Sequence, residues 1–250
     1  MATLLGRVLQ RAPRKPVAVE DDRMSVIEHL EALRRVLIIS LIAWAAATLG
    51  SFFFAGRVID FLLNHANLHN AVYFAPGGGI LNELKVAMYM GVIIAGPVVI
   101  QQFWWFISPG LHEHERRFIL PLIVATIFFF ALGVAVAIYA MPLYIAVLGR
   151  FAPQGVAYLP DLSQFLSFVL LMVIGFGFVF ELPVVLFVLG MLRIVNTRWL
   201  YKRRPYFFLA LGLVANFLTP GADPLTPMIM FVPLYLFFEG TTLLLKILGR

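Results

Sequence analysis

The sequence predicts an all-α integral membrane protein with six transmembrane helices, both termini on the cytoplasmic side, and a short final pair of helices. The first observation behind this prediction is composition: 62% of the 250 residues are hydrophobic, 13% are charged, and the mean hydropathy is +0.93. A soluble domain carries about 45–50% apolar and about 25% charged residues. The chain therefore has more apolar surface than a water-soluble fold of this size can bury.

The second observation is a series of six apolar stretches. A hydrocarbon core of about 30 Å needs roughly 20 helical residues. The fifth stretch, residues 206–218, covers only about 20 Å as a helix, and the sixth contains Pro233 and Glu239. We therefore expect this corner either to thin the bilayer or to be sheltered by protein. The stretches cover residues 36–54, 86–107, 118–148, 165–191, 206–218 and 228–245.

The third observation is the distribution of basic residues. Only Arg57, Lys85 and Arg150 lie in one set of alternate loops, and the other sixteen Lys and Arg residues lie in the remaining loops and the termini. Because basic loops stay in the cytoplasm, both termini are predicted to be cytoplasmic. The same bias explains the net charge of +6, so no nucleic-acid partner is expected. The chain has no cysteine, which excludes disulfides and thiolate metal sites.

Two regions are expected in the chain. Residues 1–23 are predicted to form a cytoplasmic N-terminal tail, and residues 24–250 a single six-helix transmembrane domain. The tail has two interpretations, a short surface helix or a disordered segment, and its polar, proline-containing linker favours the second. The first apolar stretch is long enough to span a membrane, so it is interpreted as an uncleaved anchor.

Two carboxylates occur inside apolar stretches, Glu181 and Glu239. A charge at bilayer depth costs about 2.5–3.5 kcal/mol, so such a residue faces protein or water, pairs, or is protonated. Gly177 lies one turn before Glu181 and permits a close helix approach. Pro183 removes the hydrogen bond to the Val179 carbonyl and bends the helix. We predict that Glu181, Gly177 and Glu239 dock partner helices; the alternative for Glu181 is a polar partner on a neighbouring span.

Acids also occur beside the membrane, where the composition is otherwise basic. His112 to Glu115 do not form an HExxH motif, and side chains two apart diverge on a helix, so no metal is expected. Acids at this surface attract an arginine-bearing ligand if the local arginines turn away. Glu28 and Glu31 are three residues apart ahead of the first span, where the alternative is an ordinary helix start with an exposed ion pair.

The sequence contains no constellation for catalysis. It has no paired membrane aspartates and no Ser/His couple, and the glycines at 77–79 lack the GK[ST] of a phosphate loop. We therefore expect neither an enzyme nor a cofactor. A small proton-coupled carrier, with Glu181 and Glu239 relaying protons, is the alternative function.

Five segments together resemble the TatC family, the multi-spanning subunit of the twin-arginine protein translocase. The resemblance covers roughly residues 25–245, and its segments are HLEALRR, QQFWWFISPGLHEHERRFILPL, FVFELPVV, KRRPYFFL and LTPGADPLTPMIMFVPLYLFFE. It implies a receptor in the cytoplasmic membrane that exports folded proteins using the proton motive force. The implied partners are TatA- and TatB-type single-span subunits, twin-arginine signal peptides, membrane lipid and further copies of the chain in a larger complex.

The resemblance also assigns residues by motif position. It implies that Glu115 binds the signal arginines, that Glu181 docks a partner span, and that Arg34 belongs to the N-terminal motif. The residues implied to shape the arginine site are Phe106, Pro109, Leu111 and Arg117. The family pattern is HLxELR, but here the acid, Glu31, precedes Ala32, a rotation of about 100° on a helix. Three arrangements stay open: Glu31 reaches the site, Glu28 substitutes, or Glu113 works with Glu115.

Overall fold

The computed structural model describes residues 26–68, 71–72, 77–108, 118–150, 161–218 and 225–249. Within these residues the secondary structure is helical apart from one isolated bridge between Val72 and Asp161, so the all-α class is confirmed for the described part. The helices are α1 (Val26–Phe52), α2 (Ala55–His65), α3 (Gly78–Ile107), α5 (Ile119–Arg150), α6 (Leu162–Val179), α7 (Leu182–Met191), α8 (Thr197–Leu218) and α9 (Leu225–Ile247).

Five of the described segments are long and apolar enough to cross a membrane. They are Ile27–Phe52, Gly78–Ile107, Ile119–Arg150, Leu162–Met191 and Pro227–Ile247. The chain is therefore a multi-pass membrane protein. The helix predicted as the fifth span, α8, is present but is not among these five. Its first half carries the basic run at 202–204, which leaves only the second half apolar.

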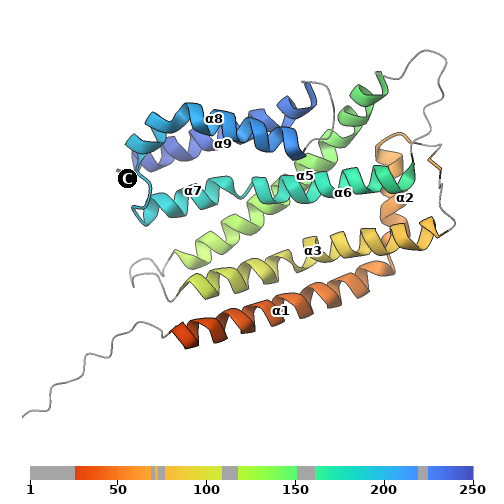
Figure 1. The fold of residues 1–250 in the computed structure, drawn as a ribbon, viewed down its shortest axis with the longest axis horizontal. Helices are drawn as coiled ribbons and strands as arrows, with labels where there is room; N and C mark the ends of the chain where they lie inside the picture. Colours follow the sequence, from red (N-terminus) through yellow and green to blue (C-terminus); the bar gives the residue numbers. More distant parts are fainter. Residues whose placement is uncertain are drawn as a thin grey trace, which may run out of the picture.

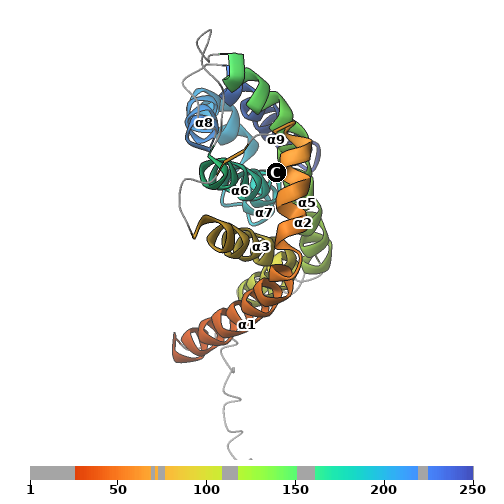
Figure 2. The ribbon, with the colours of Figure 1, turned by 90° about the vertical axis from the view of Figure 1, so that its right-hand side faces the viewer.

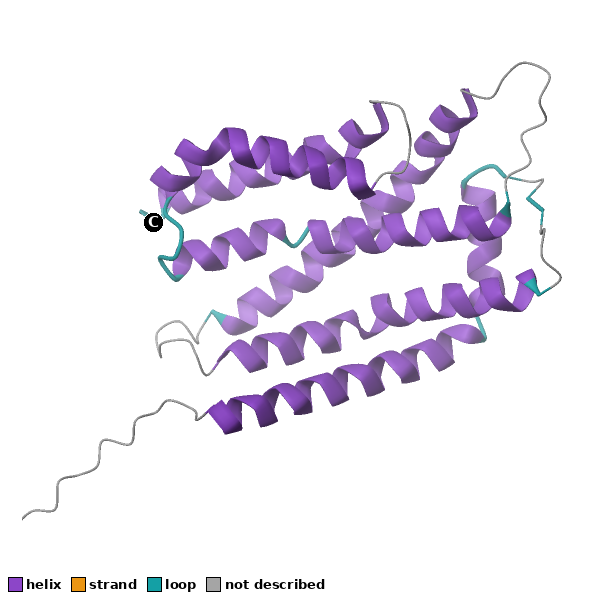
Figure 3. Ribbon diagram, in the orientation of Figure 1, coloured by secondary structure: helices purple, strands orange, loops and turns teal. Residues whose placement is uncertain are grey.

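The helices form a curved assembly. In Figure 1, α1 and α3 run side by side at one edge, α6 and α7 follow one line through the middle, and α8 pairs with α9 at the other edge. Figure 3 shows the described residues almost entirely as helix, with a short loop between α6 and α7. The view in Figure 2 shows the assembly as an arc, with α5 and α2 along one side. Helix α1 packs mainly against α3, so most of its surface stays exposed.

The fourth span is broken where the sequence predicts a bend. Helix α6 ends at Val179, Phe180 and Glu181 form a turn, and α7 begins at Leu182 with Pro183 in its first turn. Because proline has no N–H, the backbone hydrogen bonding of α6 cannot continue through Pro183. The Glu181 N–H donates instead to the Phe178 carbonyl, with an N···O distance of 3.1 Å.

Small residues set the crossing of α5 and α6. A Cβ placed on Gly133 would lie 2.5 Å from the Phe176 carbonyl oxygen and 3.0 Å from the Gly177 Cα. A Cβ placed on Gly177 would lie 2.7 Å from the ring of Phe130. The two backbones are therefore in direct contact, an arrangement that only glycine permits at these positions.

Helix α2 was not predicted from the sequence. Its buried residues are Ala55, Ile59 and Leu62, with Ala66 after its end, which is the spacing of one helical face. The ring of His65 then reaches α5, where Nε2 lies 3.1 Å from the Ile138 carbonyl oxygen. Pro142 lies four residues after Ile138 and has no N–H for that carbonyl. His65 therefore supplies the hydrogen bond that the proline removes.

Helices α8 and α9 pack through aromatic rings. Helix α8 starts after Asn196, whose side-chain oxygen accepts from the Trp199 N–H at 2.8 Å. Phe207 stacks on Phe238 with ring centroids 4.6 Å apart. Phe208 meets Phe231 edge to face at 4.8 Å. Such pairs add to the burial of apolar area, and Phe238 belongs to the same hydrophobic core as the buried residues of α5 and α6.

Candidate functional site

One open pocket lies between the start of α1 and the end of α3. It has a volume of about 770 Å³. Of the residues singled out in the sequence, it is lined by Glu28, Glu31, Arg34 and Phe106. The ring of Phe106 stacks on His29 with centroids 4.4 Å apart, which ties α1 to α3 at this end. The structure therefore brings together two acids and one aromatic residue from segments more than seventy residues apart in sequence.

The two acids on α1 occupy the same pocket although only one was expected from the family pattern. Glu28 and Glu31 are three residues apart and so lie on one face of the helix. Arg34 and Arg35 also line the pocket, so its charge is mixed. An incoming guanidinium therefore competes with these arginines for the two carboxylates.

Several predicted site residues lie outside the described part of the chain. These are Pro109, Leu111, Glu113, Glu115 and Arg117. The described flanks of that loop are Ser108, which follows α3, and Phe118, which precedes α5. Since Phe106 lines the pocket, the end of α3 lies close to the acids of α1.

A second, apolar groove contains Glu181. It has a volume of about 330 Å³ and lies between α1 and α3 on one wall and α5 and α6 on the other. The side chain of Glu181 is half-buried, and its Oε1 atom is buried without a hydrogen-bond partner among the described residues. Other groove residues are Ser40, Leu41, Trp44, Val92, Ala95, Gly96, Val99, Ile100, Phe130 and Phe178.

Gly177, predicted to admit a partner helix beside Glu181, instead contacts another helix of this chain. Its open side is filled by the ring of Phe130 from α5. The close approach that this glycine permits is therefore made by α5. Glu181 itself faces the groove, where Phe130 and Phe178 flank it. The bend between α6 and α7 places Glu181 in the groove, and Gly177 allows α5 to pack closely against α6.

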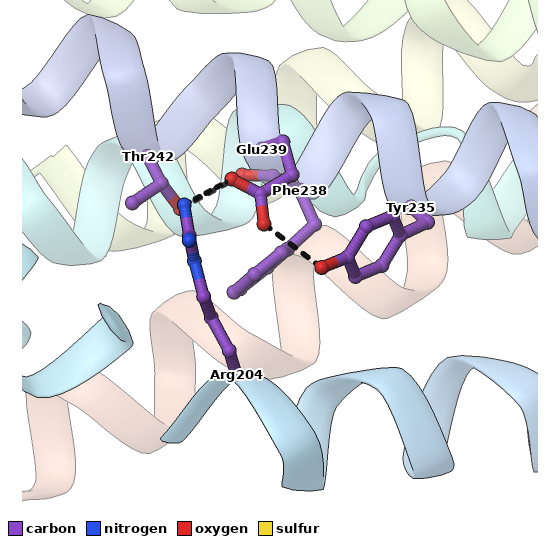
Figure 4. A network of polar contacts seen from close by, with 5 residues as sticks. All are labelled: Arg204, Tyr235, Phe238, Glu239 and Thr242. Carbon is purple, nitrogen blue, oxygen red and sulfur yellow. Dashed lines mark hydrogen bonds and ion pairs between the residues drawn. The ribbon is translucent and has the colours of Figure 1, made fainter. Parts of the chain in front are cut away.

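Glu239 has partners within the chain. Figure 4 shows its carboxylate between Arg204 of α8 and Tyr235 of α9. Arg204 Nη2 donates to Glu239 Oε2, and the Tyr235 hydroxyl donates to Oε1 at 3.0 Å. The Arg204 guanidinium also lies 4.1 Å from the ring centroid of Tyr201. This network joins α8 to α9, so the acid is neutralised locally.

Sequence reasoning missed the residues of the groove on α1. Ser40 and Trp44 both line it, and the Trp44 indole N–H donates to the Met88 carbonyl on α3 at 3.2 Å. Their spacing of four residues places both on one face of α1. A serine and a tryptophan at this spacing inside an apolar span were the available signal. They mark the side of α1 that turns toward the groove.

Sequence reasoning also missed a polar contact near the start of α3. The ammonium group of Lys85 donates to the Ser167 hydroxyl at 2.8 Å and to the Ser163 hydroxyl at 3.2 Å. Both serines lie on α6, so this contact joins α3 to α6 at the start of the fourth span. The signal was a lysine close to the end of a predicted span, with two serines four residues apart near the start of another.

The apolar spans, the pocket and the groove define the class of protein to which the chain belongs. The chain is a multi-pass helical membrane protein with a pocket of mixed charge at one end of α1 and a half-buried carboxylate in an apolar groove. This arrangement suits the binding of a basic and apolar peptide or helix.

Comparison with known proteins identifies the family. The family model described as "Sec-independent protein translocase protein (TatC)" matches residues 28–233. A curated Sec-independent protein translocase protein TatC from Carboxydothermus hydrogenoformans is 33% identical over 231 residues, which cover 91% of this chain and 95% of the relative. The TatC protein of Aquifex aeolicus is 33% identical over 234 residues, with 91% and 97% covered.

A solved structure agrees with the sequence comparison. The crystal structure described as the twin arginine translocase receptor TatC superposes with a TM-score of 0.77 at 33% identity, covering 89% of this chain and 100% of that one. The chain therefore belongs to the TatC family. The resemblance given by the five sequence segments is confirmed.

Proposed function

We propose that this chain is the receptor subunit of a twin-arginine translocase and binds the arginine pair of a signal peptide at its cytoplasmic face. The pocket lined by Glu28 and Glu31 carries this proposal. A carboxylate accepts two parallel hydrogen bonds from a guanidinium, and such charge-assisted bonds are about twice as strong as neutral ones. The family motif assigns the first arginine-binding acid to Glu115, and the second is Glu31, Glu28 or Glu113.

The groove supplies the second part of the proposal. The apolar segment of the signal peptide, or the single span of a TatA- or TatB-type subunit, lies against α1 and α3 where Glu181 offers a polar contact. The support is the unpartnered Oε1 atom in an otherwise apolar wall. A buried acceptor without a partner favours any helix that brings a donor. Assembly with these subunits allows folded proteins to cross, driven by the proton motive force.

The receptor proposal predicts that Glu115→Gln abolishes selective binding of a twin-arginine peptide. Losing one hydrogen bond to a charged group costs about 1.5–3 kcal/mol, so affinity falls roughly 10- to 150-fold. The measurement is copurification of a signal-peptide fusion, with its two arginines or with two lysines in their place. Glu28→Gln and Glu31→Gln, measured alongside, decide which acid of α1 cooperates with Glu115.

The matched control is Asp60→Asn, which removes an exposed carboxylate on α2. It should leave recovery of the arginine fusion unchanged. Equal recovery of the arginine and lysine fusions by the unsubstituted chain contradicts the recognition claim.

The proposed topology has six spans and cytoplasmic termini in the cell membrane. Helix α8 crosses as the fifth span, although its apolar half, Tyr206–Leu218, covers only about 20 Å, so the bilayer is thinned there. The support is the sidedness of the basic residues. Reporter fusions at both termini test the topology. A reporter active only in the cytoplasm should work at each end, and activity of an export-dependent reporter at either end contradicts it.

The carrier alternative needs Glu181 and Glu239 to exchange protons. Glu239 is held by Arg204 and Tyr235, which favours a fixed ionic contact over a relay. We therefore do not adopt this function.

A further inference from the structure

Helix α8 carries a concentration of positive charge, of which the described residues pair only Arg204 with an acid. Between residues 182 and 222 the sequence contains five basic residues and no acidic one. The side chains of Arg198, Lys202 and Arg203 are exposed. On the adjoining helix, the sole acid is Glu239, and Arg204 already occupies it. The three exposed cations are therefore available to an anion outside the chain.

Aromatic residues surround these cations at the same level of the helix. Trp199 and Tyr206 are exposed, and the Arg203 guanidinium lies 5.2 Å from the ring centroid of Tyr206. Exposed Trp and Tyr side chains favour the headgroup level of a bilayer. The cations and the aromatic rings therefore lie where phospholipid headgroups lie.

An apolar stripe continues from the aromatic residues along the same face. The residues at spacings of three and four are Trp199, Lys202, Tyr206, Leu209, Leu213 and Phe217. This spacing forms one continuous face of a helix. Its apolar and aromatic members are between 45% and 82% exposed, so no described helix of the chain covers the stripe.

The dimensions of the stripe match one lipid molecule. From Tyr206 to Phe217 the helix rises about 16 Å, which is long enough to accompany one acyl chain, since a chain extends over half of a hydrocarbon core of about 30 Å. A phosphate at the level of Lys202 therefore places an acyl chain beside Leu209 and Leu213. The face offers cations, then aromatic rings, then apolar side chains, in the order in which a phospholipid presents phosphate, glycerol and acyl chain.

We propose that the outward face of α8 is a binding site for an anionic phospholipid, with Arg198, Lys202 and Arg203 on the headgroup and Leu209 and Leu213 along an acyl chain. Charge complementarity selects an anionic lipid over a zwitterionic one. The site anchors the short helix at the headgroup level. It does not depend on the proposed receptor role, because it concerns lipid and not the signal peptide.

The test is native mass spectrometry of the delipidated full-length chain, titrated with phosphatidylglycerol or phosphatidylcholine. Each basic group at an anionic surface contributes about fivefold. The unsubstituted chain should therefore bind phosphatidylglycerol on the order of a hundredfold more tightly than phosphatidylcholine. The triple variant Arg198→Gln, Lys202→Gln, Arg203→Gln should bind the two lipids alike. Arg198→Lys with Arg203→Lys should keep the preference.

The matched control is Arg7→Gln, Arg11→Gln, Arg14→Gln, which removes the same charge from the N-terminal tail and should keep the preference. Loss of preference in this control would assign the effect to net charge and overturn the site. A preference retained by the triple variant would overturn it as well and leave the stripe to a protein helix. Glycerophosphoglycerol, the headgroup without chains, should bind far more weakly than the lipid. Equal binding would reduce the site to a phosphate contact and overturn the acyl part.

Discussion

At the scale of single residues, glycine decides how close two spans come. Gly133 of α5 faces the backbone of Phe176, and a Cβ there would lie 2.5 Å from the carbonyl oxygen. Gly149 lies in the same helix, and among the described residues outside the local helix backbone no atom lies within 4 Å of its added Cβ. The close contact with α6 therefore requires glycine at position 133 but not at position 149. The sequence does not distinguish the two, because both lie in one predicted span.

Gly133→Ala is expected to destabilise the protein. The backbone of α6 must move to admit the methyl group, and overpacking of this kind typically costs about 1–3 kcal/mol. Gly149→Ala should leave stability unchanged or raise it slightly, because alanine favours a helix over glycine. Thermal unfolding of the purified variants in detergent is the measurement. A midpoint for Gly133→Ala equal to that of Gly149→Ala would show that the α5–α6 contact is not as close as described.

The intramembrane acids show how far residue-level prediction reached. Their position in apolar stretches required that each find a partner, face a groove or be neutral. The sequence did not indicate which outcome applies to which residue. Glu239 pairs with Arg204, thirty-five positions earlier in the chain, and that pairing depends on how α8 folds back onto α9. Glu181 keeps an unpartnered oxygen in the groove, which depends on the separation between α3 and α6.

At the scale of elements, proline and histidine act as a pair on different helices. Pro142 has no N–H for the Ile138 carbonyl, and His65 of α2 donates to that oxygen at 3.1 Å. The imidazole must carry its proton on Nε2 to do so, since a carbonyl only accepts. This contact fixes α2 against α5 at the end of the assembly opposite the pocket lined by Glu28 and Glu31.

The pair predicts non-additive substitutions. His65→Phe keeps ring packing against Phe61 but loses the hydrogen bond, at a cost of about 1 kcal/mol. With Pro142→Ala already present, the alanine N–H bonds the Ile138 carbonyl, so His65→Phe should cost much less. A double-mutant cycle of thermal stability measures the coupling. Additive effects would contradict the assigned role of the histidine.

The elements themselves were predictable to different degrees. The long spans followed from apolar length, and the break in the fourth span followed from Pro183 beside Glu181. Helix α2 was missed because it is short and amphipathic, and its buried face of Ala55, Ile59 and Leu62 lies next to a longer apolar stretch. Helix α8 begins earlier than its apolar part, at Thr197, because hydropathy alone does not detect a basic first half.

At the scale of the whole molecule, the pocket and the groove lie at different levels of the same two helices. Glu31 and Trp44 are thirteen residues apart on α1, which is about 20 Å along the helix axis. A peptide whose arginines bind the acids therefore needs an apolar helical segment of about the same length to reach the groove. The curvature seen in Figure 2 leaves α1 without a partner other than α3 along most of its length, so room for such a segment exists beside it.

This geometry predicts where a bound signal peptide contacts the chain. A photo-crosslinking residue in place of Val99, which lines the groove, should capture a twin-arginine peptide. The same residue in place of Val98 is a matched control, because Val98 is not a groove residue and the two valines are similarly exposed, at 36% and 38%. A peptide with lysines for its arginines should give little product at either position, because it is not held at the acids. Equal capture at Val98 and Val99 would mean that the peptide does not follow the groove. The pocket lined by Glu28 and Glu31 would then bind the arginines without directing the apolar segment toward Glu181.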